Sequence, residues 1–303
     1  MILVAGASGC VGSALIAALN GTPGPAGAPR RLRAFVRREF DALRLRDQGV
    51  EAIAGDLVSG RGLDEAMRGV KTLVYLVDTL DRGGDIVSRD LAAVQQTLIA
   101  ARAAGVERVI AMSHVAASEE ATSPYLVARW AVELAVRQSQ LDWLLVRAPI
   151  IIGRDSTLWE LLHRVVDRSP VVPLFRWRRV EVEPVALSDV VDALRLAIDD
   201  PERGQHSYDV TGASRITFGE VLRGWARATG APRVYVPLPG WGERQLAATG
   251  WTLARLPRTE TRSLVETLRE RQVCPDPSRR FPLGRRPLTY EAALAEFRSA
   301  ASD

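Results

Sequence analysis

The stretch Met1-Ile-Leu-Val-Ala-Gly-Ala-Ser-Gly-Cys-Val-Gly12 opens the chain and decides its fold. An apolar β-type run over residues 2–5 leads through Gly6, Gly9 and Gly12 into a helix-type run over residues 11–19. In a dinucleotide-binding turn the first glycine permits a tight turn, the second lets a pyrophosphate approach the backbone, and the third lets the helix pack on the sheet. The helix N-terminus then offers N–H donors to the phosphates. An ordinary glycine-rich turn is the alternative, but strand, loop and helix in register favour a dinucleotide site.

The composition is that of a globular protein of 303 residues, with 47% hydrophobic and 25% charged residues. Two cysteines, Cys10 and Cys274, imply no disulfide framework, and the first strand begins at residue 2, so we expect a cytoplasmic protein without a leader. Apolar runs are too short to span a bilayer, and the net charge of +4 is spread over both halves. We therefore expect no membrane span and no nucleic-acid binding. Three scattered histidines indicate no metal site.

Strands alternate with helices through the first half of the chain. Strands are expected over residues 2–5, 32–36, 50–54, 72–77, 106–112 and 143–146, with a helical segment after each of the first five. This alternation predicts a Rossmann-type, doubly wound parallel sheet in residues 1–152. After Gly153 the alternation breaks, and residues 153–303 are expected to form a smaller α+β substrate lobe. Thr217 and Glu220 form a capping box at the start of one of its helices.

The residues after the second strand bear on the choice of cofactor. NAD sites place an Asp or Glu at the end of that strand to bind the ribose 2′-OH. Here Arg37 and Arg38 follow the strand instead, and guanidinium groups suit a 2′-phosphate. We therefore expect NADP(H). Glu39 leaves NAD(H) as the alternative, and a solvated strand end is the alternative role of the two arginines.

Several motifs together resemble the NmrA-like, nucleoside-diphosphate-sugar-epimerase-like group of atypical short-chain dehydrogenases/reductases. They are the glycine triplet, Gly55-Asp56-Leu57, Tyr75-Leu-Val-Asp78, Ser113, Tyr125-x-x-x-Arg129, Arg147-Ala-Pro149 and Pro184-Val-Ala-Leu-Ser-Asp189. The resemblance covers nearly the whole chain. It implies the Rossmann fold and an NAD(P) site, whereas the activity stays open because the group includes reductases, redox sensors and assembly subunits.

The resemblance also implies cofactor contacts. Asp56 corresponds to an aspartate that contacts the adenine amino group, and its alternative role is the N-cap of the segment that follows. Ser8 and Val77-Asp78 should border the nicotinamide side, together with Pro149. The expected cofactor-binding residues are Gly6, Ser8, Gly9, Cys10, Val11, Gly12, Arg37, Arg38, Asp56, Leu57, Val77, Arg129 and Pro149.

Tyr125 and Arg129 stand where the group carries Tyr-x-x-x-Lys. In that motif the lysine lowers the pKa of the tyrosine and binds the nicotinamide ribose, while a serine on the preceding strand orients the substrate carbonyl. The i,i+4 spacing puts Tyr125 and Arg129 on one helix face, and Ser113 ends the fifth strand. Arginine keeps the charge that would depress a tyrosine pKa, but its planar head does not replace a compact ammonium under a ribose.

Two roles therefore stay open for Arg129: it is a working replacement for the lysine, or it marks a site that no longer relays protons. Two roles also stay open for Tyr125, which is either the proton donor or a residue packed at the lobe interface.

We expect Tyr125, Ser113 and Arg129 to be catalytic in an NADPH-dependent oxidoreductase that reduces a small apolar carbonyl, enone or quinone. We expect this protein to be a monomer or homodimer. The alternative function is a non-catalytic NADP(H)-sensing regulator or assembly factor. An apolar wall is expected from Trp159, Phe175, Trp177 and Trp241, with core packing as its alternative, and part of a lid from Asp81-Arg-Gly-Gly84.

Overall fold

A parallel sheet forms the centre of the molecule, which a computed structural model describes over residues 1–78, 85–200, 202–238 and 258–302. Its seven strands have the order β11-β6-β5-β4-β1-β2-β3, and every neighbouring pair is parallel. The predicted Rossmann-type, doubly wound sheet is confirmed. The strands are β1 (Ile2–Ala5), β2 (Leu32–Val36), β3 (Glu51–Ala54), β4 (Thr72–Tyr75), β5 (Arg108–His114), β6 (Asp142–Ala148) and β11 (His206–Asp209).

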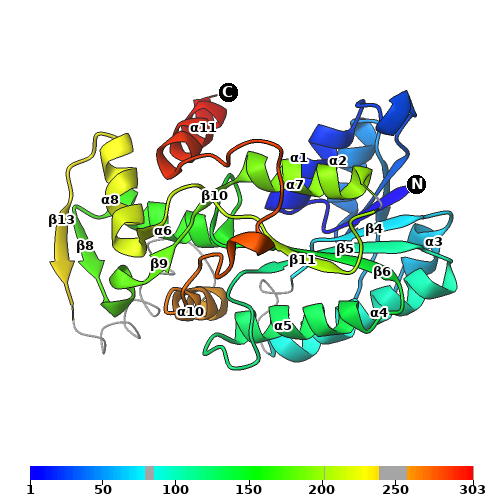
Figure 1. The fold of residues 1–303 in the computed structure, drawn as a ribbon, viewed down its shortest axis with the longest axis horizontal. Helices are drawn as coiled ribbons and strands as arrows, with labels where there is room; N and C mark the ends of the chain where they lie inside the picture. Colours follow the sequence, from blue (N-terminus) through cyan, green and yellow to red (C-terminus); the bar gives the residue numbers. More distant parts are fainter. Residues whose placement is uncertain (79–84, 201, 239–257, 303) are drawn as a thin grey trace.

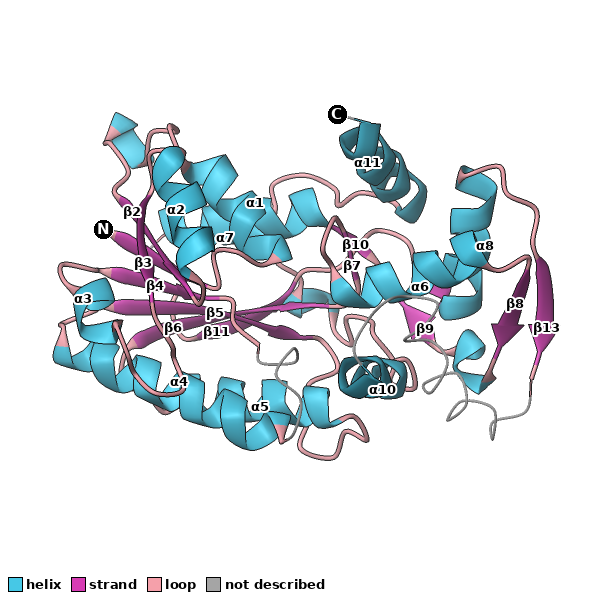
Figure 2. Ribbon diagram, turned by 180° about the vertical axis from the view of Figure 1, so that it is seen from behind, coloured by secondary structure: helices cyan, strands magenta, loops and turns pink. Residues whose placement is uncertain are grey.

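Helices cover both faces of this sheet (Figures 1 and 2). One face carries α1 (Cys10–Leu19), α2 (Glu39–Asp47) and α7 (Leu187–Asp199); the other carries α3 (Leu63–Met67), α4 (Ile86–Ala103) and α5 (Pro124–Arg137). In β1, Val4 packs toward the first layer and Leu3 and Ala5 toward the second, and all three are buried. Because both faces are covered, an uninterrupted apolar strand is stable at this position.

The strand order places a switch point beside β1. From β1 the chain builds outward through β2 to β3, and then crosses to β4 on the other side of β1. The connections after β1 and β4 therefore diverge and leave a crevice at the carboxyl ends of the strands, where ligands bind in folds of this kind. The glycine loop lies in this crevice because it follows β1 directly.

The second half forms a smaller lobe with its own apolar core. It contains α6 (Thr157–Arg168), α8 (Phe218–Ala228), α10 (Arg258–Thr267) and α11 (Tyr290–Ser302), with the strand pairs β7 (Ile151–Ile152) with β10 (Val185–Ala186), β8 (Val171–Leu174) with β13 (Val234–Pro237), and β9 (Glu181–Val182) with β12 (Ile216–Thr217). The capping box is confirmed, since Thr217 Oγ1 accepts from the Glu220 N–H at 3.3 Å and the Glu220 carboxylate accepts from the Thr217 N–H at 2.7 Å. The division after residue 152 stays a prediction, and β11 joins β6 from beyond it.

Three of the four residues expected to wall the substrate site lie in the core of this lobe instead. Trp159 is fully buried, with its ring edge-on to Trp225 and Phe297 at 5.4 and 5.6 Å, and Phe175 and Trp177 are 2% and 3% exposed. The apolar-wall expectation is wrong for these three because a small lobe needs its largest rings to fill its interior. Trp241 and Asp81–Gly84 lie outside the described residues.

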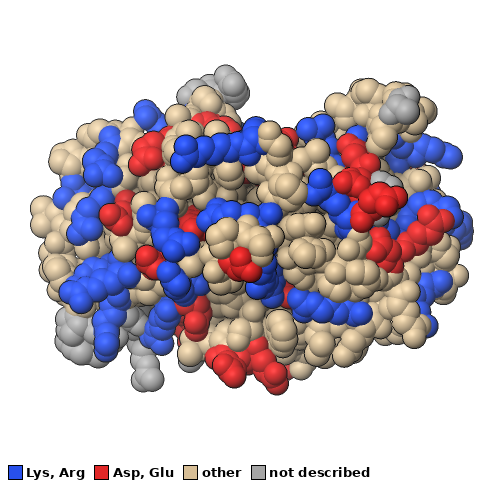
Figure 3. Space-filling view, in the orientation of Figure 1, with Lys and Arg blue, Asp and Glu red and all other residues tan. Residues whose placement is uncertain are grey.

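The surface carries charges of both signs. On the face seen in Figure 3, arginines are interspersed with Asp and Glu over both lobes. Within the described ranges, no helix combines the length and apolar character that a bilayer crossing requires.

Candidate cofactor and acceptor pocket

A cavity of about 460 Å³ opens at the carboxyl ends of the central strands. Each residue expected at the cofactor or in catalysis lines it, including Ser8, Cys10, Val11, Leu57 and Pro149. The cavity thus joins segments that are far apart in sequence, from the glycine loop to the start of α6 and to α10. The individual roles of these residues stay predictions.

The three glycines differ in what the protein demands of them. Gly6 has a φ of +86°, and a Cβ at Gly12 would lie 2.1 Å from the Gly6 carbonyl oxygen, so both positions are fixed by the chain itself. A Cβ at Gly9 would meet only the Gly6 oxygen, at 3.4 Å. Gly9 is also the N-cap of α1, and no side chain caps the helix there. The loop therefore leaves space and uncapped N–H groups for an anionic ligand, which fits a pyrophosphate.

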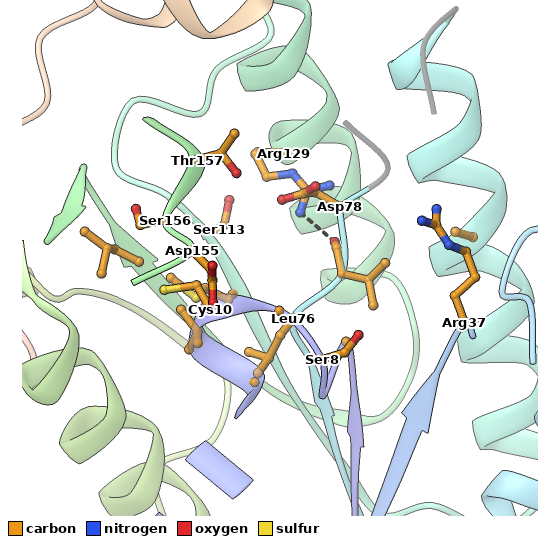
Figure 4. Close-up of a pocket in the computed structure, with 18 of the residues that line it drawn as sticks. Ser8, Cys10, Arg37, Leu76, Asp78, Ser113, Arg129, Asp155, Ser156 and Thr157 are labelled. Carbon is orange, nitrogen blue, oxygen red and sulfur yellow. Dashed lines mark hydrogen bonds between the residues drawn. The ribbon is translucent and has the colours of Figure 1, made fainter. Parts of the chain in front are cut away.

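The end of β2 presents arginine rather than carboxylate to the cavity. Arg37 is exposed, and in Figure 4 its side chain extends from the end of β2 along the cavity. Arg38 donates from Nε to the Asp41 carboxylate at 2.8 Å. Asp41 also lines the cavity, and this hydrogen bond engages its carboxylate. Glu39, the alternative ligand for a ribose 2′-OH, pairs with Arg46 at 2.7 Å and is not among the cavity-lining residues. This arrangement favours a 2′-phosphate over a free 2′-OH.

Asp56 holds its own turn together. Its Oδ1 accepts from the N–H groups of Val58 at 2.8 Å and Ser59 at 3.3 Å. The helix that follows, α3, is capped by Gly62. The N-cap alternative for Asp56 is therefore wrong, because the chain makes a tight turn before α3 begins.

Arg129 ties three elements together beneath the pocket. Its buried guanidinium forms an ion pair with Asp90 of α4 and donates to the Val77 carbonyl oxygen, after β4, at 2.8 Å (Figure 4). The same group lies 5.6 Å from the centre of the Tyr125 ring. Burial lowers the pKa of the guanidinium, and the nearby Asp78 carboxylate opposes that effect.

The expected depression of the Tyr125 pKa is wrong. Burial raises the pKa of this phenol, and the negative charge of Asp78 raises it further. The guanidinium beside the ring is already compensated by Asp90, so it offers little stabilisation to a phenolate. Tyr125 therefore stays protonated and can donate a hydrogen bond, but it releases its proton less readily than the expected motif requires.

Two adjacent residues at the end of β5 carry buried polar atoms that lack partners among the described residues. Ser113 is 5% exposed and its hydroxyl has no hydrogen bond; His114 is 6% exposed and its Nε2 has none. The other ring nitrogen of His114, Nδ1, accepts from the Ala116 N–H at 3.1 Å. Burial lowers the pKa of His114 to about 3, so the ring is neutral.

Asp78, expected beside the nicotinamide, lines the cavity, whereas the sequence did not reveal His114 or the residues contributed by the second lobe. His114 is the last residue of β5, and this position is a signal available in the sequence, because side chains at the carboxyl ends of parallel strands face the ligand site. The second lobe adds the start of α6, where Asp155 has a φ of +61°, and two residues of α10. Their approach to the pocket depends on tertiary packing and has no local signature. They are Asp155, Ser156, Thr157, Leu158, Leu264 and Thr267.

Comparison with known proteins agrees with this geometry. A family model described as NAD(P)H-binding matches residues 6–169. The chain is 30% identical over 246 residues, 80% of this chain and 74% of the other, to a ceramide reductase of Caulobacter vibrioides. Among solved structures, an NADPH-dependent quinone oxidoreductase of Escherichia coli complexed with NADPH has a TM-score of 0.77 at 18% identity, covering 98% of this chain and 100% of that one. A triphenylmethane reductase of Citrobacter sp. complexed with NADP(H) has a TM-score of 0.75 at 20% identity, covering 98% and 99%.

The family match covers more than half of the chain, and the curated relative covers most of it. The solved structures share the whole fold, including the smaller lobe. The resemblance inferred from the sequence is thereby confirmed, and the chain belongs to the NAD(P)H-binding oxidoreductase family.

Proposed function

We propose that this protein is an NADPH-dependent reductase of the atypical short-chain dehydrogenase/reductase type, acting on an apolar carbonyl, enone or quinone. One observation carries the proposal. A single cavity joins the glycine loop and Arg37 to Ser113 and Tyr125, so a dinucleotide and an oxygen-bearing acceptor would meet in it. The solved neighbours bound to NADPH and NADP(H) support the choice of cofactor.

Different groups of the chain would bind different parts of the cofactor. The first turn of α1 and the space at Gly9 would bind the pyrophosphate, and Arg37 the 2′-phosphate. Asp56 and Leu57 would border the adenine, while Val77 and Pro149 would border the nicotinamide. The nicotinamide would supply the hydride when the cofactor is bound.

The acceptor end would bind and protonate an oxygen atom. The unpartnered hydroxyl of Ser113 would donate to that oxygen, and Tyr125 would deliver the proton after hydride transfer. Arg129 would act by holding the Tyr125 ring and the end of β4, because its guanidinium is engaged by Asp90 and by the Val77 carbonyl. Apolar side chains at this end, among them Ile150, Leu158 and Leu264, suit an apolar acceptor.

A second candidate function is an NADP(H)-sensing regulator or assembly factor without turnover. The specific observation in its favour is the raised pKa of Tyr125 beside a compensated Arg129, since a site that need not relay protons tolerates both. The two candidates share the cofactor and differ in turnover.

The test is NADPH consumption with a panel of apolar ketones, enones and quinones, followed by the variant Tyr125→Phe. The phenylalanine keeps the ring under Arg129 and removes only the hydroxyl. For a ketone or enone we expect turnover to fall by about a hundredfold, the lower end of general acid–base effects, while the NADPH dissociation constant is unchanged. Quinones should be affected less, because their reduced oxygens can take protons from water.

Absence of turnover across the panel, with NADPH still bound, would favour the sensor. Turnover that Tyr125→Phe leaves unchanged for ketones and enones would remove Tyr125 from the mechanism but retain the reductase.

A further inference from the structure

His114 carries a hydrogen-bond donor whose purpose the fold does not explain. Because Nδ1 accepts from the Ala116 N–H, the neutral ring carries its proton on Nε2. Nε2 is buried and no described group accepts a hydrogen bond from it. A buried donor without a partner costs about 1–3 kcal/mol. Such a group in a native site calls for an explanation, and a role toward a bound ligand is one that fits a cavity-lining residue.

The neighbouring side chains do not supply that partner. The Gln272 side chain approaches the imidazole as a weak hydrogen-bonding neighbour and raises the pKa of His114 against the effect of burial, but the contact lacks the geometry of a full hydrogen bond to Nε2. Its Oε1 accepts from the Ile150 N–H at 3.1 Å, and its Nε2 donates to the Thr267 carbonyl at 3.2 Å. The Tyr125 ring stands edge-on to the imidazole at 6.3 Å between centroids.

His114 lies next to the residue expected to bind the acceptor oxygen. Ser113 and His114 end the same strand, both are more than nine-tenths buried, and both line the cavity. Tyr125, the expected proton donor, lines it beside them. Two unpartnered donors and a phenol therefore line the same cavity, and the imidazole stands beside the phenol ring.

We propose that the Nε2–H of His114 is a second donor, beside the Ser113 hydroxyl, for the oxygen of the acceptor, an inference that rests on the proposed function. The imidazole would polarise a carbonyl and stabilise the negative charge that develops on its oxygen as hydride arrives. It keeps its own proton throughout, and the proton that completes the alcohol comes from Tyr125.

The test compares two probes that differ only in that atom. Acetophenone carries a carbonyl oxygen where α-methylstyrene carries a methylene group, and NADP⁺ in place of NADPH prevents turnover. Dissociation constants of both probes for the NADP⁺-loaded protein, measured by ligand-observed NMR, give a preference ratio. The free energy of hydration of each probe is the same in every measurement and cancels when two proteins are compared. A difference in this ratio between two variants therefore reports the contact with the oxygen atom.

Two matched variants separate the roles of the two ring nitrogens. His114→Gln places an amide N–H near the position of Nε2, whereas His114→Asn keeps an acceptor near Nδ1 for the Ala116 N–H and has no donor at the Nε2 position. We expect His114→Asn to lower the ketone preference about fivefold, which corresponds to one neutral hydrogen bond of ~1 kcal/mol, and His114→Gln to retain most of it. NADPH affinity should match the wild type in both variants.

Three outcomes would overturn the proposal: an unchanged preference ratio in His114→Asn, an equal loss of preference in both variants, or a wild type that shows no preference for the ketone. A wild type that binds neither probe counts as the third outcome. If His114→Asn does not fold, the wild type still decides: acetophenone should shift the His114 Nε2 resonance in a long-range ¹H–¹⁵N spectrum and α-methylstyrene should not. NADPH consumption with quinones tests the proposed function separately. If the enzyme turns over but the His114 variants keep the wild-type preference ratio, only this inference fails. If the variants change the ratio but no turnover is found, only the proposed reductase function fails.

Discussion

The two ends of the pocket are built in different ways. The centre of the cofactor end is backbone, supplied by one contiguous loop from Gly6 to Gly12, and the turns after β2 and β3 add side chains at its edge. The acceptor end consists of side chains from β5, α5, α6 and α10, and buried polar contacts such as Arg129 with Asp90 hold it in place. A site made of backbone is specified locally, whereas a site made of side chains depends on the whole fold. The acceptor end can therefore change its chemistry while the cofactor end stays constant.

The largest effect is expected from breaking the buried ion pair that supports the acceptor end. Asp90→Ala removes the carboxylate that pairs directly with the buried Arg129 guanidinium. We expect the free energy of unfolding to fall by about 3–5 kcal/mol, measured by urea denaturation. Glu107→Ala is the control: it removes the partner of Lys71 at the surface, where both side chains are more than 60% exposed, and should cost less than about 1 kcal/mol. Similar costs for the two variants would contradict the claim that buried pairs hold this end together.

The second effect concerns the glycine loop. Gly9→Val should weaken NADPH binding by at least about a hundredfold, or ~2.7 kcal/mol, because its side chain would occupy the space left for the pyrophosphate. The melting temperature should stay near that of the wild type, since a Cβ at Gly9 meets only one oxygen at 3.4 Å. Gly12→Ala should do the reverse and lower the melting temperature, because its Cβ would lie 2.1 Å from the Gly6 oxygen. Wild-type NADPH affinity in folded Gly9→Val, measured by calorimetry, would reduce the loop to a structural turn.

A smaller effect should distinguish the two arginines after β2. Arg37→Ala should weaken NADPH binding by about 1–3 kcal/mol, the range for a hydrogen bond to a charged group, and leave NADH binding nearly unchanged. Arg38→Ala should have less effect on either cofactor, because Arg38 already bonds Asp41. Titration by calorimetry gives all six constants for the wild type and the two variants. Equal affinities of the wild type for NADPH and NADH would refute the assignment to a 2′-phosphate.

The smallest effect is a pH dependence in the lobe behind the acceptor end. Burial lowers the pKa of His163, but the hydrogen bond of its Nδ1 with Asp167 at 2.9 Å and the Glu160 carboxylate 3.5 Å from its Nε2 outweigh burial, so the folded pKa is raised above its usual value of about 6.5. A raised pKa contributes stability below about pH 6.5 that is lost as the pH rises through the folded value. We expect the free energy of unfolding, measured by urea denaturation, to fall as the pH rises above about 6.5, and to fall less in His163→Gln. An exposed histidine, His206, gives the control variant His206→Gln. Identical pH profiles for the wild type and His163→Gln would contradict this role.

The same contrast explains what the sequence could predict. The first six strands were expected within two residues of their observed ends, because strands covered on both faces are apolar throughout and are followed by turns. The spacing of the three glycines was enough to predict the cofactor loop. The compensation of Arg129 by Asp90 could not be anticipated, because the two residues are 39 positions apart and meet only when α4 packs on α5. For the same reason the pKa of Tyr125 was expected to shift in the wrong direction.

The edge strand β11 has a consequence for how the protein is made. β6 lies between β5 and β11, so the sheet that carries the cofactor loop is completed only by residues 206–209. During synthesis, the first 200 residues leave β6 as an open edge, whose unpaired N–H and C=O groups invite pairing with other chains. Native closure must wait until the ribosome has released the strand, and such non-local pairing is intrinsically slow. The nascent chain therefore passes through a stage in which chaperone protection of this edge would favour correct assembly over aggregation.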